Sequence, residues 1–158
     1  MPPDTPQLVT AGPDDHRRVR DLVRRAYARW VPVIGREPRP MQADYARAVV
    51  DHRIDLLEGE GGALIALIET DLRSDHLWIE NIAVHPDHQG RGVGSRLIAH
   101  AARLARAAGR RELQLLTNAA FLDNVRLYER LGFVTWKTEP WLESTTLYMR
   151  RSLEDPPG

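Results

Sequence analysis

The chain of 158 residues contains no cysteine. This absence excludes a disulfide framework, a thiolate metal site and a cysteine nucleophile. Any acyl transfer on this chain must therefore avoid an acyl-cysteine intermediate. The chain also lacks a net charge, because 22 basic residues balance 22 acidic ones. A neutral chain argues against nucleic acid or an anionic membrane bound by bulk electrostatics.

Long apolar runs are absent as well. No segment approaches the roughly 20 apolar residues that span a bilayer, and the start Met-Pro-Pro-Asp lacks the basic and apolar stretches of a secretory signal. These absences predict a cytoplasmic protein. Loose tails are expected over residues 1–6 and 154–158, on either side of one domain over residues 7–153. His85 and His88 lie in a turn without a third ligand, so no metal site is expected.

Helical and extended patterns alternate along the chain. An apolar stripe from Val19 to Trp30 predicts a first helix, which opens with Pro13, Asp14 and Asp15 and ends at Pro32. Further helices are expected over residues 41–52, 92–108 and 124–131. Strands are expected over residues 7–11, 54–57, 63–69, 76–84, 112–117, 133–137 and 145–151. The order β-α-α-β-β-β-α-β-α-β-β predicts an α/β protein with a mixed sheet and helices on both faces.

A glycine-rich turn, HPDHQGRGVGS over residues 85–95, joins an expected strand to an expected helix. Backbone N–H groups at a helix start carry partial positive charge, and glycines let a ligand approach, which together suit a pyrophosphate. A nucleotide P-loop would need a lysine, and a dinucleotide fingerprint would need glycine in place of Ser95. The pattern that fits is Q-x-x-G-x-G, formed by Gln89, Gly92 and Gly94. The alternative is a tight turn whose glycines serve packing alone.

Two segments of the chain resemble signatures of the GNAT family of N-acetyltransferases. The first is NIAVHPDH over residues 81–88 followed by Q-x-x-G-x-G, and the second is NVRLYERLGF over residues 124–133. They stand in the family's order, and the resemblance extends over nearly the whole chain. It implies the GNAT fold, with a central sheet splayed between two parallel strands, here residues 76–84 and 112–117. Acetyl-CoA would bind in that gap as the acetyl donor.

The resemblance also implies the donor contacts. The pantetheine arm would pair with a strand backbone, and the pyrophosphate would rest on the glycine-rich turn. The implied contacts are Ile82, Ala83, Val84, Gln89, Gly90, Arg91, Gly92, Val93, Gly94, Ser95, Asn118, Asn124 and Tyr128. Other roles stay open for the two asparagines. Asn118 could be a turn residue, and Asn124 a helix cap, a role that Asp123 could also fill.

The implied reaction is attack of an amine on the thioester. An alkylammonium ion must first lose a proton, and the departing thiolate must gain one. Tyr128 matches the family tyrosine that donates this proton, while its alternative role is that of a core aromatic. Glu80 matches a carboxylate that deprotonates the amine through water. Glu139, Glu143 and water alone remain rivals for the base.

In this family the first two helices and the last hairpin wall the acceptor site. Candidate acceptor contacts are therefore Arg36, Arg39, Tyr45 and Trp141, with solvated loop and hairpin packing as their alternatives. The expected function is acetylation of a small-molecule primary amine. A protein N-terminal or lysine acetyltransferase and a non-catalytic CoA-binding module are the other hypotheses. A homodimer is an option that the family allows.

Overall fold

The computed structural model describes residues 7–154, and contacts divide them into two compact units. The first unit comprises residues 7–70 and 81–93, and the second comprises residues 71–80 and 94–154. The single domain expected over residues 7–153 stays a prediction. The expected tails lie outside the described residues, except for Glu154, which pairs with Arg111 at 3.3 Å.

Hydrogen bonds join seven strands in the order β1-β2-β3-β4-β5-β7-β6. Their bounds are β1 Gln7–Thr10, β2 Arg53–Glu58, β3 Leu64–Leu72, β4 Leu77–Val84, β5 Glu112–Asn118, β6 Val134–Trp141 and β7 Ser144–Ser152. Strands β4 and β5 pair in parallel, with Leu77 opposite Leu113 and Ile79 opposite Leu115. The pairs β1–β2, β2–β3, β5–β7 and β6–β7 are antiparallel. The mixed sheet and the element order predicted from the sequence are confirmed.

In the first unit, helix α1 (His16–Tyr27) packs its apolar stripe against strands β2 and β3. Val19 and Val23 are fully buried and belong to one cluster with Leu56 and Leu67. Each such side chain contributes about 1.5–3 kcal/mol through burial. A 3₁₀ turn over Pro13–Asp15 precedes this helix, and its Asp15 carboxylate accepts a hydrogen bond from the Gly12 N–H at 2.8 Å. This core fixes β2 and β3, and β3 is a neighbour of β4.

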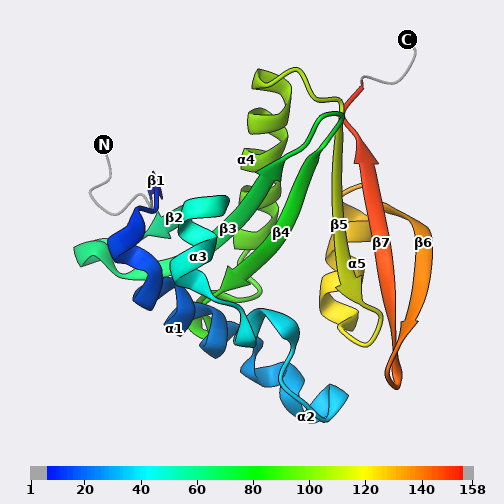
Figure 1. The fold of residues 1–158 in the computed structure, drawn as a ribbon, viewed down its shortest axis with the longest axis horizontal. Helices are drawn as coiled ribbons and strands as arrows, with labels where there is room; N and C mark the ends of the chain where they lie inside the picture. The colour runs from blue at the N-terminus through cyan, green and yellow to red at the C-terminus, as the bar shows by residue number, and fades with distance from the viewer. Residues whose placement is uncertain (1–6, 155–158) are drawn as a thin grey trace. The chain divides into compact units, whose positions relative to one another are not determined.

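The second unit contains helices α4 (Val93–Ala107) and α5 (Leu122–Arg130), of which α4 begins at the last residue of the first unit. Figure 1 shows β5, β7 and β6 side by side with α5 behind them. The buried residues Tyr128, Phe133 and Met149 form the core around α5 and these strands. The rings of Tyr128 and Phe133 meet edge to face, with their centroids 5.8 Å apart.

Three helix boundaries differ from the sequence-based predictions. Pro32 does not end the helical run, because it lies in the first turn of α2 (Val31–Ile34), where a missing N–H costs nothing. The run ends at Gly35, with φ of 75°. Helix α3 covers Tyr45–Asp51 rather than beginning at residue 41, since residues Arg39–Gln42 form a 3₁₀ turn and the Asp44 side chain caps α3 by accepting from the Arg47 N–H at 3.2 Å.

The third difference concerns α5, which begins at Leu122 and has Phe121 as its N-cap residue. Neither Asp123 nor Asn124 is the cap, because both lie inside the first turn. Within residues 7–154, none of the helices has both the length and the apolar character needed to cross a membrane.

Candidate functional site

The second half of strand β4, in the first unit, carries the backbone predicted to bind the pantetheine arm. The His85 N–H donates to the Ile65 carbonyl of β3 at 2.8 Å. Because successive residues of a strand point their backbone groups to opposite edges, Ala83 shares the β3 edge with His85. Ile82 and Val84 therefore present their N–H and C=O groups at the other edge. That edge is the one on which a ligand could pair.

The glycine-rich turn follows β4 in the same unit. Gly90 and Gly92 both have φ of 77°, a left-handed conformation that favours glycine. A Cβ placed on either residue would meet no other atom within 4 Å. Helix α4 begins at Val93, so its first N–H groups come directly after Gly92. The turn thus combines left-handed glycines, open space and a helix start, while Arg91 beside them is exposed.

The Gln89 side chain holds this turn in place through hydrogen bonds to two residues of the first unit. Its side-chain Nε2 donates to the Val84 carbonyl at 3.0 Å, and its Oε1 accepts from Arg29 Nη1 at 2.9 Å. His85 adds a second local contact, because its Nδ1 accepts from the Asp87 N–H at 3.1 Å. The Gln89 side chain therefore shapes the turn, and a role in donor binding would come through the turn that it holds in place.

Gly94 belongs to the second unit, where helix packing rather than backbone conformation favours glycine at this position. A Cβ on Gly94 would lie 2.9 Å from Leu127 Cδ2, so the absence of a side chain lets α5 approach α4. Its neighbour Ser95 is half-buried in the first turn of α4. Gly94 is thus a glycine that serves packing, whereas Gly90 and Gly92 are left-handed glycines with open space around them.

Asn81 is a buried polar residue of β4 that the sequence analysis did not include among the candidates. It is 4% exposed; its Oδ1 accepts from the Tyr27 hydroxyl at 2.7 Å, and its Nδ2 donates to the Tyr45 hydroxyl at 3.1 Å. The Tyr45 hydroxyl donates in turn to the Pro40 carbonyl at 2.7 Å. An amide in the mostly apolar strand β4 was the signal in the sequence.

The acceptor candidates of the first unit differ in their surroundings. Tyr45 is 3% exposed and belongs to the core cluster, which favours a supporting role over direct contact with an acceptor. The Arg36 guanidinium donates from Nη1 to the Ile34 carbonyl at 3.3 Å and is partly buried, whereas Arg39 is exposed. These residues lie in or beside one segment, residues 36–42.

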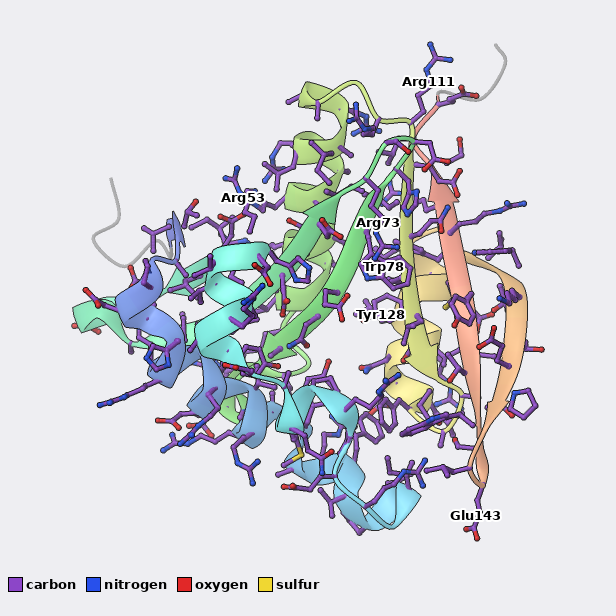
Figure 2. The ribbon with its side chains drawn as sticks, viewed as in Figure 1. Arg53, Arg73, Trp78, Arg111, Tyr128 and Glu143 are labelled. Carbon is purple, nitrogen blue, oxygen red and sulfur yellow. The ribbon has the colours of Figure 1, made fainter. Side chains whose placement is uncertain are left out.

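In the second unit, Glu80 is exposed at the end of the β4 segment that pairs with β5. Its Oε2 accepts a hydrogen bond from Trp78 Nε1 at 2.6 Å. The Trp78 ring is buried and is covered by the Arg73 guanidinium at 4.6 Å from the ring centroid (Figure 2). The Glu80 carboxylate is thus oriented by an indole.

Tyr128 comes from the last turns of α5 and is 8% exposed. Burial raises the pKa of its phenol to about 12, because an apolar environment disfavours the phenolate. The phenol therefore keeps its proton through the neutral and moderately alkaline range. A buried phenol of this kind can hold a proton for a base formed beside it.

The two asparagine candidates of the second unit have different surroundings. Asn118 Oδ1 accepts from the Ala120 N–H at 2.8 Å and from the Ser144 hydroxyl at 2.6 Å, which favours the turn role. Asn124 is half-buried in the first turn of α5 and does not cap it. Loss of the capping alternative leaves the family contact as the prediction for Asn124.

The β6–β7 hairpin holds the rival bases. Glu139 accepts from the Tyr148 hydroxyl at 3.1 Å and pairs with Lys137 at 2.7 Å, and the Lys137 hydrogen bond holds the pKa of Glu139 below its usual value. A lower pKa makes this carboxylate a weaker base. Glu143 is exposed at the tip of the hairpin (Figure 2), and Trp141 is half-buried opposite Ser144.

Comparison with known proteins defines the class of this fold and site. The sequence model of the acetyltransferase (GNAT) family matches residues 17–133. The chain belongs to this family, and the prediction made from the two signatures is confirmed. Among the described residues, no group of three His, Asp or Glu side chains is arranged to hold a metal ion.

A curated relative, the streptothricin acetyltransferase of Streptomyces lavendulae, is 34% identical over 85 residues, or 52% of this chain. The chain spans 45% of that relative's length. The PaiA N-acetyltransferase from Thermoplasma acidophilum, solved in complex with coenzyme A, has a TM-score of 0.79 at 15% identity and covers 94% of this chain and 99% of its own. The ribosomal-protein-S18-alanine N-acetyltransferase from Escherichia coli has a TM-score of 0.77 at 20% identity and covers 97% of each chain. These two structures are similar to this chain in fold.

Proposed function

We propose that this chain transfers the acetyl group of acetyl-CoA to a primary amine. The observation that carries the proposal is the glycine-rich turn, where Gly90 and Gly92 are left-handed, open to a ligand and placed directly before α4. Backbone N–H groups at such a helix start suit the pyrophosphate of coenzyme A. Membership of the GNAT family supports acetyl-CoA as the donor.

The pantetheine arm is proposed to pair with the edge of β4 that Ile82 and Val84 present. A backbone N–H of this edge would polarise the acetyl carbonyl and stabilise the oxyanion that forms there. Gln89, Arg91, Val93 and Ser95 complete the proposed pyrophosphate site as neighbours of the two open glycines. Ala83 supports this edge from within, because its own backbone groups point toward β3.

The reaction is proposed to occur by direct attack in a ternary complex. The amine nitrogen bonds to the thioester carbon, the carbon–sulfur bond breaks, and the thiolate takes a proton from Tyr128. The proton that the ammonium group loses passes through water to Glu80. The nitrogen loses its second proton to solvent as the amide forms, so the products are the acetylated amine and coenzyme A. Glu80 then releases its proton to solvent and Tyr128 regains one, which leaves a net release of one proton.

A small molecule is proposed as the acceptor. Streptothricin acetyltransferase, a relative at 34% identity, supports this proposal, and its matched region covers 52% of this chain. The proposed acceptor contacts are the arginines of segment 36–42 and Trp141. A guanidinium suits a carboxylate of the acceptor, and the indole suits an apolar part.

A panel of amines tests the proposal, with release of coenzyme A from acetyl-CoA as the measurement. The panel should contain streptothricin, amino acids, polyamines and a peptide with a free N-terminus. Turnover on a small amine, with little on the peptide, is expected. Turnover on the peptide alone would instead support a protein acetyltransferase. Binding of acetyl-CoA without turnover on any amine would support a non-catalytic module.

A further inference from the structure

A hydrogen-bond network in the first unit connects β4 to the segment before α3. It starts near the edge of β4 that Ile82 and Val84 present, which is called the donor edge below because acetyl-CoA, the acetyl donor, is proposed to pair with it. Its members are the Tyr27 hydroxyl, the Asn81 amide, the Tyr45 hydroxyl and the Pro40 carbonyl, and it is called the Asn81 network below. The three distances between donors and acceptors are 2.7, 3.1 and 2.7 Å along this order. Asn81 and Tyr45 are both less than 5% exposed, so water does not compete for these bonds.

Counting protons shows which group donates in each hydrogen bond of the network. A tyrosine hydroxyl has one proton, and Tyr45 donates it to the Pro40 carbonyl. Tyr45 must therefore accept from Asn81, which turns Nδ2 toward Tyr45 and Oδ1 toward Tyr27. The Tyr27 hydroxyl then donates mainly to Asn81 at 2.7 Å, because its other acceptor, the Ile82 carbonyl, is at 3.2 Å.

The Ile82 and Val84 carbonyls, both on the donor edge of β4, differ in their hydrogen-bond partners. The Val84 carbonyl accepts from Gln89 Nε2 at 3.0 Å. Within residues 7–154, the Ile82 carbonyl accepts a long side-chain contact from Tyr27 at 3.2 Å, and its second lone pair can accept from a ligand N–H. A ligand amide that donates to Ile82 would compete with the long Tyr27 contact and favour the shorter hydrogen bond from Tyr27 to Asn81.

The other end of the network holds segment 36–42. Tyr45 fixes the Pro40 carbonyl, and Arg24 Nη1 donates to the Met41 carbonyl at 2.9 Å. The Arg24 guanidinium also pairs with Glu37 at 2.8 Å. The segment that is predicted to wall the acceptor site is therefore attached both to α1 and, through Asn81, to β4.

We infer that Asn81 is a positioning residue that couples donor binding on β4 to the order of segment 36–42. The inference rests on the proposed function, because the ligand that engages Ile82 is taken to be the pantetheine arm. Donor binding fixes the Tyr27 proton on Asn81, and this strengthens the hold of Asn81 on Tyr45 and of Tyr45 on Pro40. The acceptor wall is thus ordered when the donor is in place.

Hydrogen exchange of the full chain, with and without coenzyme A, tests this coupling without knowledge of the acceptor. Coenzyme A should slow exchange of the amides at residues 41–43 in the wild-type chain by about fivefold, the equivalent of one net hydrogen bond. Tyr45→Phe removes the hydroxyl that joins Asn81 to Pro40. In this variant the slowing should disappear. Because coupling is reciprocal, the affinity for coenzyme A should fall by no more than about the same fivefold factor, since the binding edge of β4 is intact.

Tyr148→Phe is the matched control, since it removes a hydroxyl that bonds to Glu139 in the second unit. It should retain the wild-type slowing at residues 41–43. If Tyr45→Phe fails to fold, Tyr27→Phe breaks the network at its other end and should show the same loss. The inference is overturned if coenzyme A binds the wild-type chain without slowing exchange there, or if either network variant keeps the slowing. Failure of coenzyme A to bind the wild-type chain would overturn the proposed function instead.

Discussion

The indole Nε1 of Trp78 donates a hydrogen bond to Glu80 Oε2 at 2.6 Å, and this bond joins two residues of β4 that share one face of the strand. The donor is buried and the acceptor is exposed. A carboxylate held in this way loses rotamer freedom but keeps contact with solvent. Such a group is suited to take a proton from an ammonium ion through water.

Glu80→Gln should slow turnover at neutral pH while leaving acetyl-CoA binding intact. The amide can accept the Trp78 hydrogen bond but cannot take a proton. At high pH the acceptor amine is already free, so turnover should recover in part. Steady-state rates from pH 6 to 10, with the acceptor found in the amine panel, give the measurement.

The matched control for this variant is Glu60→Gln, which changes an exposed glutamate in the turn between β2 and β3. It should keep the wild-type pH profile. Equal turnover of Glu80→Gln and the wild-type chain at every pH would show that Glu80 has no part in proton transfer. The rival Glu139 would then be tested by Glu139→Gln.

Gly92→Glu should abolish the rise in melting temperature that acetyl-CoA produces in the wild-type chain. The substitution places a negative charge and a side chain in the open space of the turn. Gly61→Glu is the control, because Gly61 also has a left-handed φ, of 67°, and open space around its Cβ position. Both variants carry similar strain of about 1–2 kcal/mol. A normal acetyl-CoA shift in folded Gly92→Glu would contradict the pyrophosphate assignment.

The element order and the family could be predicted because their signals are local. The stripe from Val19 to Trp30 repeats at helical spacing, and its buried residues are Val19, Leu22, Val23, Ala26 and Trp30. Helix ends were less predictable, since a proline both stops a helix and starts one. Pro32 belongs to the second case because its turn continues from Trp30 without requiring its N–H group.

The side-chain partners could not be predicted, because they depend on residues far apart in sequence. Asn81 and Tyr45 are 36 residues apart, and Asn118 and Ser144 are 26 apart. A motif assigns Gln89 to the cofactor, but its amide is used by Val84 and Arg29. The sequence thus predicts the site segments, whereas the structure separates the residues that hold a segment in place from the residues that are left open to a ligand.

Asn118→Ala should lower the free energy of unfolding by about 1–3 kcal/mol, because its Oδ1 satisfies both the Ala120 N–H and the Ser144 hydroxyl. Affinity for acetyl-CoA should not change if Asn118 is a turn residue. Urea unfolding and calorimetric titration measure the two quantities. Ser144→Ala removes one of the two bonds and should cost less. A large loss of affinity without loss of stability would instead support a cofactor contact.

Tyr128 should make the chain less stable at alkaline pH. Its pKa is raised from 10.0 to about 12, so between these values the unfolded chain loses the phenol proton and the folded chain keeps it. The stabilisation is fully present below pH 10 and is lost as pH rises toward 12, by up to about 1.4 kcal/mol per pH unit. Urea unfolding at pH 9, 10 and 11 should show a shallower decline for Tyr128→Phe than for the wild-type chain. Parallel declines would contradict burial of the phenol.

Tyr128→Phe should lower the maximal rate by about 10²–10⁴-fold, the usual effect of losing a general acid. The change removes one hydroxyl and keeps the ring, which still packs edge to face against Phe133, so affinity for acetyl-CoA should barely change. A thiolate is only moderately basic, with a reference pKa of about 8.5 for a cysteine thiol, and water can replace the phenol in part. The lower end of the range is therefore expected. Phe133→Leu, which alters the same packing but keeps the phenol, is the control and should lose stability more than rate. Full turnover by folded Tyr128→Phe on the acceptor amine would show that Tyr128 serves packing alone.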